Sequence, residues 1–282
     1  MTAATATLAN AAKPPIKVRR MNFQFPDSLP TFWFDDNPLL TATLSALAVA
    51  FPPGERYFIA SVRHFLPQVD DPELLAQVRG FVGQEANHTK EHVAFNKFLD
   101  GRGFPASAME KWVSGRIAKL QKRSTPEANL ARTAALEHFT AILASVLLEN
   151  PDILERMSPE VARLWAWHAI EEVEHRSVAF DVYKQTVDDE ALRLRVMRAT
   201  TALFLSANFV RTLMLLRVSG RLWDVRSALK GLNLLWGEAG LFRQVVPLYL
   251  EYFRKDFHPS QLDSRASLDA AKLRYLGERA AL

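Results

Sequence analysis

Two short segments with the same spacing constrain the fold of this chain. Each reads Glu-x-x-His, first as Glu85-Ala-Asn-His88 and again as Glu172-Val-Glu-His175. Residues three apart on an α-helix lie on one face, so each segment forms a claw of one carboxylate and one imidazole that point the same way. Both segments are therefore predicted to be helical and to offer two metal ligands each.

A solitary glutamate precedes each claw within an apolar stretch. Glu55 is the only acidic residue between positions 37 and 69, and Glu137 is the only one between positions 128 and 148. The interval from Glu55 to Glu85 is 30 residues and that from Glu137 to Glu172 is 35, about one helix, a turn and part of the next helix. A glutamate from each of two helices and a Glu-x-x-His from each of two others form the ligand set of a four-helix bundle that binds two metals.

Each of these residues also has a plain structural explanation. Glu55 could be a first-turn glutamate favoured by the helix dipole, and Glu85 with His88 could be a surface ion pair. Glu137 is harder to explain in this way, because it lies among small residues on a face that looks buried, where a carboxylate needs a cation or a partner. The recurrence of the half-motif favours the metal site.

Two neighbouring residues leave alternatives open. His92 lies one turn past His88 and close to the same face, so it is either an extra ligand or, as we prefer, a pocket residue that supports the ligands. Glu171 stands four residues before His175 and shares its face, but the Glu-x-x-His spacing favours Glu172 as the ligand.

The segment from Trp167 to Tyr183 carries a family resemblance. It resembles the fourth helix of ferritin-like di-iron carboxylate proteins, and within them the bacterial family described as predicted metal-dependent hydrolases. The resemblance runs from about Arg20 to about His258. It implies an all-α fold, a ferritin-like four-helix bundle with additional C-terminal helices.

A second resemblance is to di-iron enzymes of the p-aminobenzoate N-oxygenase type, which add a third histidine one turn before the last claw. His168, Glu172 and His175 stand at the corresponding offsets of His-x-x-x-Glu-x-x-His. This resemblance implies two iron ions, with manganese or zinc as alternatives. The implied ligands are Glu55, Glu85, His88, Glu137, His168, Glu172 and His175.

Composition narrows the chemistry. Hydrophobic residues make up 49% of the chain with helical spacing throughout, which predicts an all-α protein. The absence of cysteine excludes disulfides, thiolate zinc sites and iron–sulfur clusters, so nitrogen and oxygen ligands remain. The net charge of +4 is spread along the chain without a nucleic-acid motif, and no nucleic-acid partner is expected.

Four regions are expected along the chain. Residues 1–20 read as a flexible arm, 21–189 as the bundle, 190–257 as added apolar helices and 258–282 as a polar tail. Within the bundle, Pro52-Pro53-Gly54 is expected to break a helix, and one continuous helix is expected from 158 to about 186. The uncharged run from Ala199 to Val210 falls short of the ~18–20 residues that span a membrane, so the added helices either cover the core or lie at a membrane surface.

Three classes of function fit these features. The first is an oxidoreductase in which two irons activate O2 with electrons from a donor, with Glu55 and Glu137 as flexible or bridging carboxylates and His92 in the catalytic pocket. The second is a metal-dependent hydrolase with metal-activated water. The third is a non-enzymatic metal-binding protein. A cytoplasmic location is expected, with contact to the inner face of a membrane and homodimer formation left open.

The apolar C-terminal helices suggest the substrate. They predict a small apolar or amphipathic organic molecule that enters beneath residues 199–218 and 234–253. Three basic residues of these segments, Arg211, Arg217 and Arg243, are candidates to hold a carboxylate or phosphate head group. The alternative is that these helices only enlarge the core or form a dimer interface.

Overall fold

The computed structural model describes residues 15–279, and over these residues the fold is all-α, which confirms the predicted fold class. Its only β contact in this range is an isolated antiparallel bridge between Phe34 and Met157. The helices are α1 (Pro38–Ala48), α2 (Phe51–Phe65), α3 (Pro72–Gly101), α4 (Ala106–Arg123), α5 (Pro126–Glu149), α6 (Pro151–Glu155), α7 (Pro159–His175), α8 (Val178–Thr186), α9 (Glu190–Val218), α10 (Val225–Trp236), α11 (Leu241–Glu251) and α12 (Arg265–Ala271).

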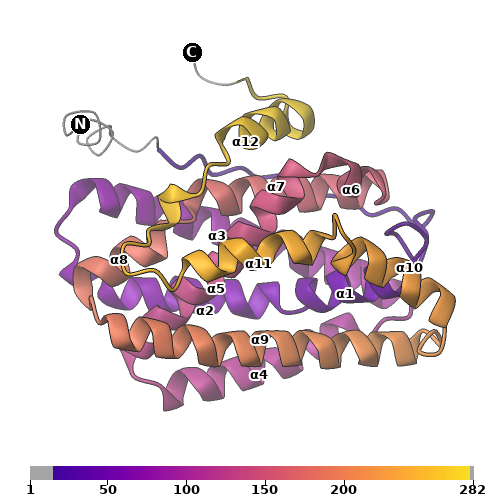
Figure 1. Cartoon of the computed structure of the whole chain (residues 1–282), viewed down its shortest axis with the longest axis horizontal. Helices are drawn as coiled ribbons and strands as arrows, with labels where there is room; N and C mark the ends of the chain where they lie inside the picture. Colours follow the sequence, from indigo (N-terminus) through magenta and orange to yellow (C-terminus); the bar gives the residue numbers. More distant parts are fainter. Residues whose placement is uncertain (1–14, 280–282) are drawn as a thin grey trace.

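The centre of the molecule is a bundle of α2, α3, α5 and α7, with α8 continuing the line of α7 (Figure 1). Helix α2 packs along α3, and α5 packs along α7. Local sequence starts the two long members: the Asp71 side chain accepts from the backbone N–H of Glu73, and the Thr125 side chain accepts from that of Ala128. Proline follows each cap, where a missing N–H costs no helical hydrogen bond. The arrangement is consistent with a ferritin-like bundle.

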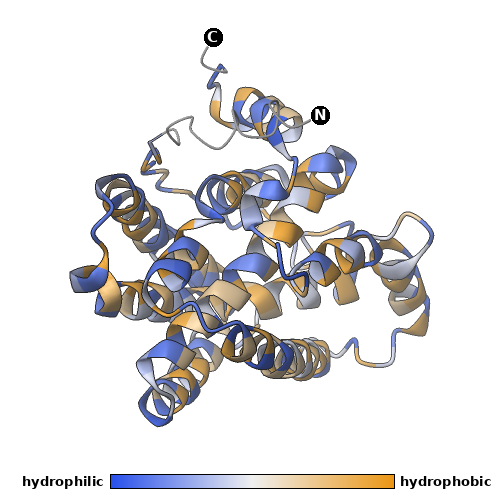
Figure 2. Ribbon diagram, turned by 60° about the vertical axis from the view of Figure 1, so that its left-hand side comes forward, coloured by the Kyte–Doolittle hydropathy of each residue, from blue (hydrophilic) through white to orange (hydrophobic). Residues whose placement is uncertain are grey.

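A layer of buried polar side chains divides the hydrophobic core into two clusters. On α3, Phe81 belongs to one cluster and Phe95 to the other, and on α5 Leu130 and Phe139 are separated in the same way. Coloured by hydropathy, most helices carry both apolar and polar residues, as amphipathic helices do (Figure 2). The glutamates and histidines predicted as ligands lie between the two clusters along these helices.

The structure corrects the position of the helix break that was expected at Pro52-Pro53-Gly54. Helix α2 begins at Phe51 and includes all three residues, and the preceding turn lies at Val49 and Ala50 instead. Both prolines occupy the first turn, where their missing N–H groups have no intrahelical acceptor and their fixed φ suits the helix. Glu55 consequently sits at the end of the first turn of a helix that enters the core.

The expected continuous helix from 158 to 186 is also corrected. Helix α7 ends at His175, and a turn at Arg176 and Ser177 leads into α8. The Arg176 guanidinium donates to the carbonyl of Leu262 (2.7 Å) and to the hydroxyl of Ser264, so this turn anchors a segment almost 90 residues later. The last predicted ligand therefore lies at the end of its helix.

The C-terminal third is more structured than expected. The helix predicted over 234–253 is divided into α10 and α11 by a turn at Gly237 to Gly240. Earlier in the chain, helix α4 was also not anticipated. Residues 258–279 are not a free tail: they form α12 and a π-helical turn from Lys272 to Leu276 that packs on α7. Most of the predicted N-terminal arm lies outside the described residues, but its end, at Arg19, is buried.

Two of the described helices, α5 and α9, pass a test of length and apolar composition for membrane spans. The apolar window of α5 is 78% buried in the protein, as expected of a core helix, whereas that of α9 is 28% buried. A core helix of a soluble protein passes the same test, so composition alone does not assign α9 to a membrane. Its partial exposure does distinguish it from α5.

Candidate metal centre

All seven predicted ligands converge in the polar layer of the bundle. None is more than 4% exposed, although each carries a group that ordinarily prefers water. Helix α2 supplies Glu55, α3 supplies one claw, α5 supplies Glu137, and α7 supplies the other claw with the third histidine. The residues are Glu55, Glu85, His88, Glu137, His168, Glu172 and His175.

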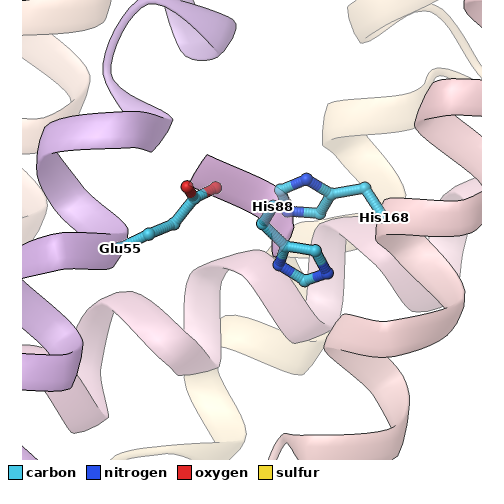
Figure 3. A group of neighbouring side chains, drawn as sticks. All are labelled: Glu55, His88 and His168. Atoms are coloured by element: carbon cyan, nitrogen blue, oxygen red, sulfur yellow. The ribbon is translucent and has the colours of Figure 1, made fainter. Parts of the chain in front are cut away.

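Their donor atoms form three overlapping groups, each within a span of 4.8 Å. The first joins Glu55, His88 and His168, and Figure 3 shows the Glu55 carboxylate reaching toward the two rings. The other two are Glu85 with Glu137 and His175, and Glu85 with His88 and Glu172. The groups share Glu85 and His88, so the cluster offers two adjacent candidate positions for a metal ion.

The glutamates of the two claws, Glu85 and Glu172, each lie near imidazoles of more than one ligand group. One oxygen of Glu172 is 2.9 Å from His168 Nε2, and its other oxygen is 3.5 Å from His175 Nε2. One oxygen of Glu85 lies 3.6 Å from His88 Nδ1 and 3.2 Å from His175 Nε2. Each carboxylate therefore faces imidazoles of both positions.

Glu55 and Glu137, the carboxylates expected to be flexible or bridging, belong to different ligand groups. Glu55 groups only with His88 and His168, whereas Glu137 lies on the other side, 3.3 Å from His175 Nε2. The bridging role of these two glutamates therefore stays a prediction. The claw glutamates come from helices that reach both positions.

The inward-facing atoms fit metal ions. Both carboxylate oxygens of Glu55, Glu85 and Glu137 are buried without a hydrogen-bond partner, as are atoms of the remaining glutamate and of two histidines that face them. Burying unpaired carboxylates is costly, so a set of four in one layer needs compensating positive charge. Two divalent cations would balance four carboxylates, and carboxylate oxygen with imidazole nitrogen suits iron, manganese or zinc.

Burial and neighbouring charges shift the pKa values of the buried glutamates in different directions. Burial raises the pKa of Glu137 to about 8, and burial with the nearby Glu85 carboxylate raises the pKa of Glu55 well above its usual value. Burial also raises the pKa of Glu172, but two imidazoles, first that of His175, outweigh it and hold this pKa well below the usual value. Metal binding would therefore release protons from the two glutamates outside the claws.

Each claw histidine is held by a residue of the opposite claw helix. His88 Nε2 lies 3.1 Å from a carboxylate oxygen of Glu171, and His175 Nδ1 lies 2.9 Å from the amide oxygen of Gln84. Both acceptors take an N–H, which leaves the inward nitrogens, Nδ1 of His88 and Nε2 of His175, free to bind a metal. Glu171 thus contacts the outward nitrogen of His88, whereas Glu172 belongs to one of the candidate ligand groups, which favours Glu172 as the ligand.

These supports meet at a buried arginine near the N-terminus. Arg19 contacts Glu171 (3.1 Å), Glu174 (2.7 Å) and Glu278 (2.9 Å). Glu174 also accepts from the amide of Gln84 at 2.8 Å. Both supporting residues are therefore linked through one charge network.

The sequence argument missed Gln84, Arg19 and the role of Glu171. One signal was visible, because a hydrogen-bonding residue stands immediately before the glutamate of each claw, as Gln84-Glu85 and as Glu171-Glu172. Arg19 had no such signal, since its partners lie more than 150 residues away in the chain.

His92 lies beside the ligands in the predicted supporting position. Its Nε2 is 2.6 Å from Nδ1 of His168, whose Nε2 faces the cluster. The ring of Phe51 covers both imidazoles, with centroids 4.8 Å from His92 and 4.6 Å from His168. Burial lowers the pKa of both histidines, which keeps them neutral, the form in which a histidine binds metal.

Replacing His168 with alanine is expected to lower the occupancy of one metal position and leave the other filled. The reason is that His168 groups with Glu55 and His88 only, while the position at Glu137 keeps its own imidazole. Metal content and the visible spectrum of the purified variant measure the effect, with circular dichroism to show that the helices persist. Unchanged metal binding and turnover would reduce His168 to a packing residue.

A small apolar cavity opens on the metal cluster. Its volume is about 60 Å³, and its wall includes His168 and Glu172. Apart from these two and Thr140, the lining is apolar, with contributions from α1, α2, α5, α7, α9 and α11. Apolar side chains of α9 and α11 thus face two of the candidate metal ligands, His168 and Glu172, across this cavity.

The sequence of this chain was compared with known protein families, curated proteins and solved structures. Residues 17–263 match the family model described as predicted metal-dependent hydrolase, which covers most of the chain and all seven clustered residues. No curated protein and no solved structure matches the chain. The extent of the family match, together with the buried carboxylate and histidine cluster, identifies the chain as a member of the family of predicted metal-dependent hydrolases.

Proposed function

We propose that this protein is a two-metal enzyme whose centre lies between α2, α3, α5 and α7, and that hydrolysis is its reaction class. The observation that carries the proposal is the set of inward carboxylate and imidazole atoms that are fully buried and make no hydrogen bond. Such atoms are rare in folded proteins and demand an explanation, which two cations supply. Hydrolysis is favoured over other metal chemistry by the description of the family.

The bound metals would lower the pKa of a water molecule and polarise the scissile carbonyl or phosphoryl group. The protein's own residues prepare this site in three ways. Glu171 and Gln84 hold the protons of two claw histidines on their outward nitrogens, and His92 does the same for His168 when it accepts from Nδ1. The apolar cavity excludes bulk water and selects an apolar part of the substrate.

A second candidate function is an O2-activating oxidoreductase with two irons, an electron donor and an organic substrate. The observation in its favour is that all seven residues of the N-oxygenase pattern meet, including the third imidazole at His168. Hydrolytic two-metal sites more often draw their ligands from loops at strand ends, whereas this one is built from bundled helices. Manganese or zinc remains an alternative to iron in either function.

Metal analysis of the purified protein tests the proposed metal centre. The purified protein is expected to hold about two transition-metal ions per chain, because seven ligands exceed what one metal takes. Elemental analysis measures the count, and anomalous diffraction locates the ions. At most one metal, located away from Glu85 and Glu172, would contradict the proposal.

Turnover of a panel of apolar acyl and phosphate esters is then compared with and without oxygen. Hydrolysis is expected to proceed without O2 and without a reductant, since neither enters the reaction. Product that appears only with O2 and an electron donor, with measurable O2 consumption, would replace hydrolysis with the second function.

A further inference from the structure

A second and much larger cavity runs along the outside of the bundle. Its volume is about 850 Å³, and we call it the α4–α9 groove, because these two helices form its outer walls while α2 and α5 form its floor. Both outer helices lie at the lower edge of Figure 1. The α9 wall runs from Thr200 to Met214, which is about 20 Å at 1.5 Å per residue. The groove therefore has the size of a small-molecule site and an elongated shape.

The α4–α9 groove adjoins the small cavity at the metal centre. Four residues line both spaces: Leu47, Phe51, Thr140 and Phe204. Phe51 also covers the imidazoles of His92 and His168. A molecule lying in the groove would therefore pass beside the one wall of side chains that separates it from the metal ligands.

The groove is strongly apolar and opens to solvent along α9. Large hydrophobic side chains on its rim are exposed, among them Leu203 (47%), Val210 (50%), Met214 (49%) and, across the groove on α4, Trp112 (56%). An exposed apolar surface of this kind is uncommon on a soluble protein and marks a binding site.

Three arginines line the groove, Arg116, Arg132 and Arg211, and only Arg211 is buried. Arg211 is only 6% exposed, and its Nε donates to the backbone carbonyl of Ala46 at 3.0 Å. No carboxylate lies within ion-pair distance of it among residues 15–279, whereas the other buried arginine of α9, Arg193, is paired with Glu190 at 2.6 Å. Burial lowers the pKa of Arg211 to about 10, so it still carries its charge at neutral pH. A buried unpaired guanidinium is costly unless an anion binds it.

Arg211 lies on α9 at a short distance from Phe204, which lines the cavity at the candidate metal centre. It lies seven residues after Phe204, which is two helical turns and about 10 Å along the same face of α9. The two other basic positions considered from the sequence, Arg217 and Arg243, are exposed and line neither cavity. Arg211 alone of the three is placed to hold a head group inside the groove.

We propose that the α4–α9 groove binds a single-chain anionic amphiphile, with its carboxylate on Arg211 and its hydrocarbon chain along α9 past Phe204. That such a molecule is also the substrate class of the metal centre rests on the proposed function. The buried position of the guanidinium favours this occupant over a membrane surface, whose phosphates would remain outside the groove. A second copy of the chain would need to insert a carboxylate at the same depth.

The test is calorimetric titration of the purified metal-containing protein with decanoate and with decanol, which differ only in the charged head. Arg211→Met is expected to weaken decanoate binding tenfold or more and to leave decanol binding unchanged, because a charge-assisted bidentate contact is lost. Arg217→Met is the matched control on the same helix and should change neither affinity. Ala207→Trp, which fills the groove from its α9 wall, should abolish binding of both ligands.

Several results would overturn the inference. Equal decanoate binding by the wild type and Arg211→Met would remove the head-group role, and binding unaffected by Ala207→Trp would place the ligand elsewhere. Association only with anionic phospholipid vesicles, or a dimer in analytical ultracentrifugation that Ala207→Trp dissociates, would identify a membrane or a second copy as the occupant. Thermal melting of each variant shows whether it is folded.

Metal content measured on the same samples separates this inference from the proposed function. Two metals with ester turnover but no decanoate binding would refute the groove alone. Decanoate binding to a protein that holds no metals would refute the metal centre alone.

Discussion

Glu172→Ala is expected to reduce the metal content from about two ions per chain to fewer than one and to abolish turnover. The two oxygens of Glu172 face different imidazoles, at 2.9 Å from His168 and 3.5 Å from His175, so its loss removes a ligand from both positions. The remaining carboxylates would then face one another with less cation to balance them, which weakens the second ion as well. Elemental analysis of the purified variant measures this loss.

The neighbouring residue provides a matched control. Glu171→Gln retains an oxygen that can accept from His88 Nε2, and Glu171 contributes no atom to the three ligand groups. Both metals are expected to remain, with affinity reduced by at most about tenfold, the lower end of the usual cost of altering a partner of a metal-bound histidine, because the hydrogen bond is kept and only its charge is lost. If Glu171→Gln lost its metals and Glu172→Ala kept them, the assignment of ligand and support would be reversed.

Arg19→Met is expected to lower the free energy of unfolding by about 3 kcal/mol, the lower end of the cost of breaking a buried ion pair. The variant would leave Glu171, which has no exposed surface, without its cation, and would remove one partner from Glu174 and Glu278. Urea unfolding followed by circular dichroism measures the change, and loss of metal affinity should accompany it because Glu171 orients His88.

A substitution of Lys17 tests whether burial of the ion pair explains the loss of stability expected for Arg19→Met. Lys17 also pairs with Glu278, at 2.6 Å, but its side chain is 62% exposed. Lys17→Met is therefore expected to cost no more than about 1 kcal/mol, as exposed pairs do. Equal destabilisation by the two variants would show that the N-terminal segment, and not the buried charge network, is what matters.

The two claws of the candidate metal centre are supported in a similar way. Each claw is preceded by a hydrogen-bonding residue, Gln84 on α3 and Glu171 on α7, and each of these holds the histidine of the opposite helix. The two halves differ in chemistry, since one support is an amide and the other is a carboxylate in contact with Arg19. A carboxylate partner makes an imidazole more basic, so His88 is expected to be the stronger of the two donors.

The sequence by itself determined the all-α fold and the residues that gather at the centre. Helical spacing of apolar residues fixes the class of fold, and a period of three or four fixes which polar residues share a face with it. Glu137 and the two claws could be recognised because a charge within an apolar helix face has to be compensated wherever that face is buried. These are local properties of single helices, and they do not depend on how the helices pack together.

Only the tertiary structure decided how those residues share their roles. The distribution of the carboxylates among the three ligand groups, with Glu55 and Glu137 in different groups, depends on the directions from which four helices approach one layer. The helix start at Phe51 and the turn after His175 depend on the balance between local propensity and packing at each end. Arg19 and the unpaired Arg211 owe their surroundings to segments distant in the chain, at Glu171 and Ala46, and no pattern within one helix encodes such contacts.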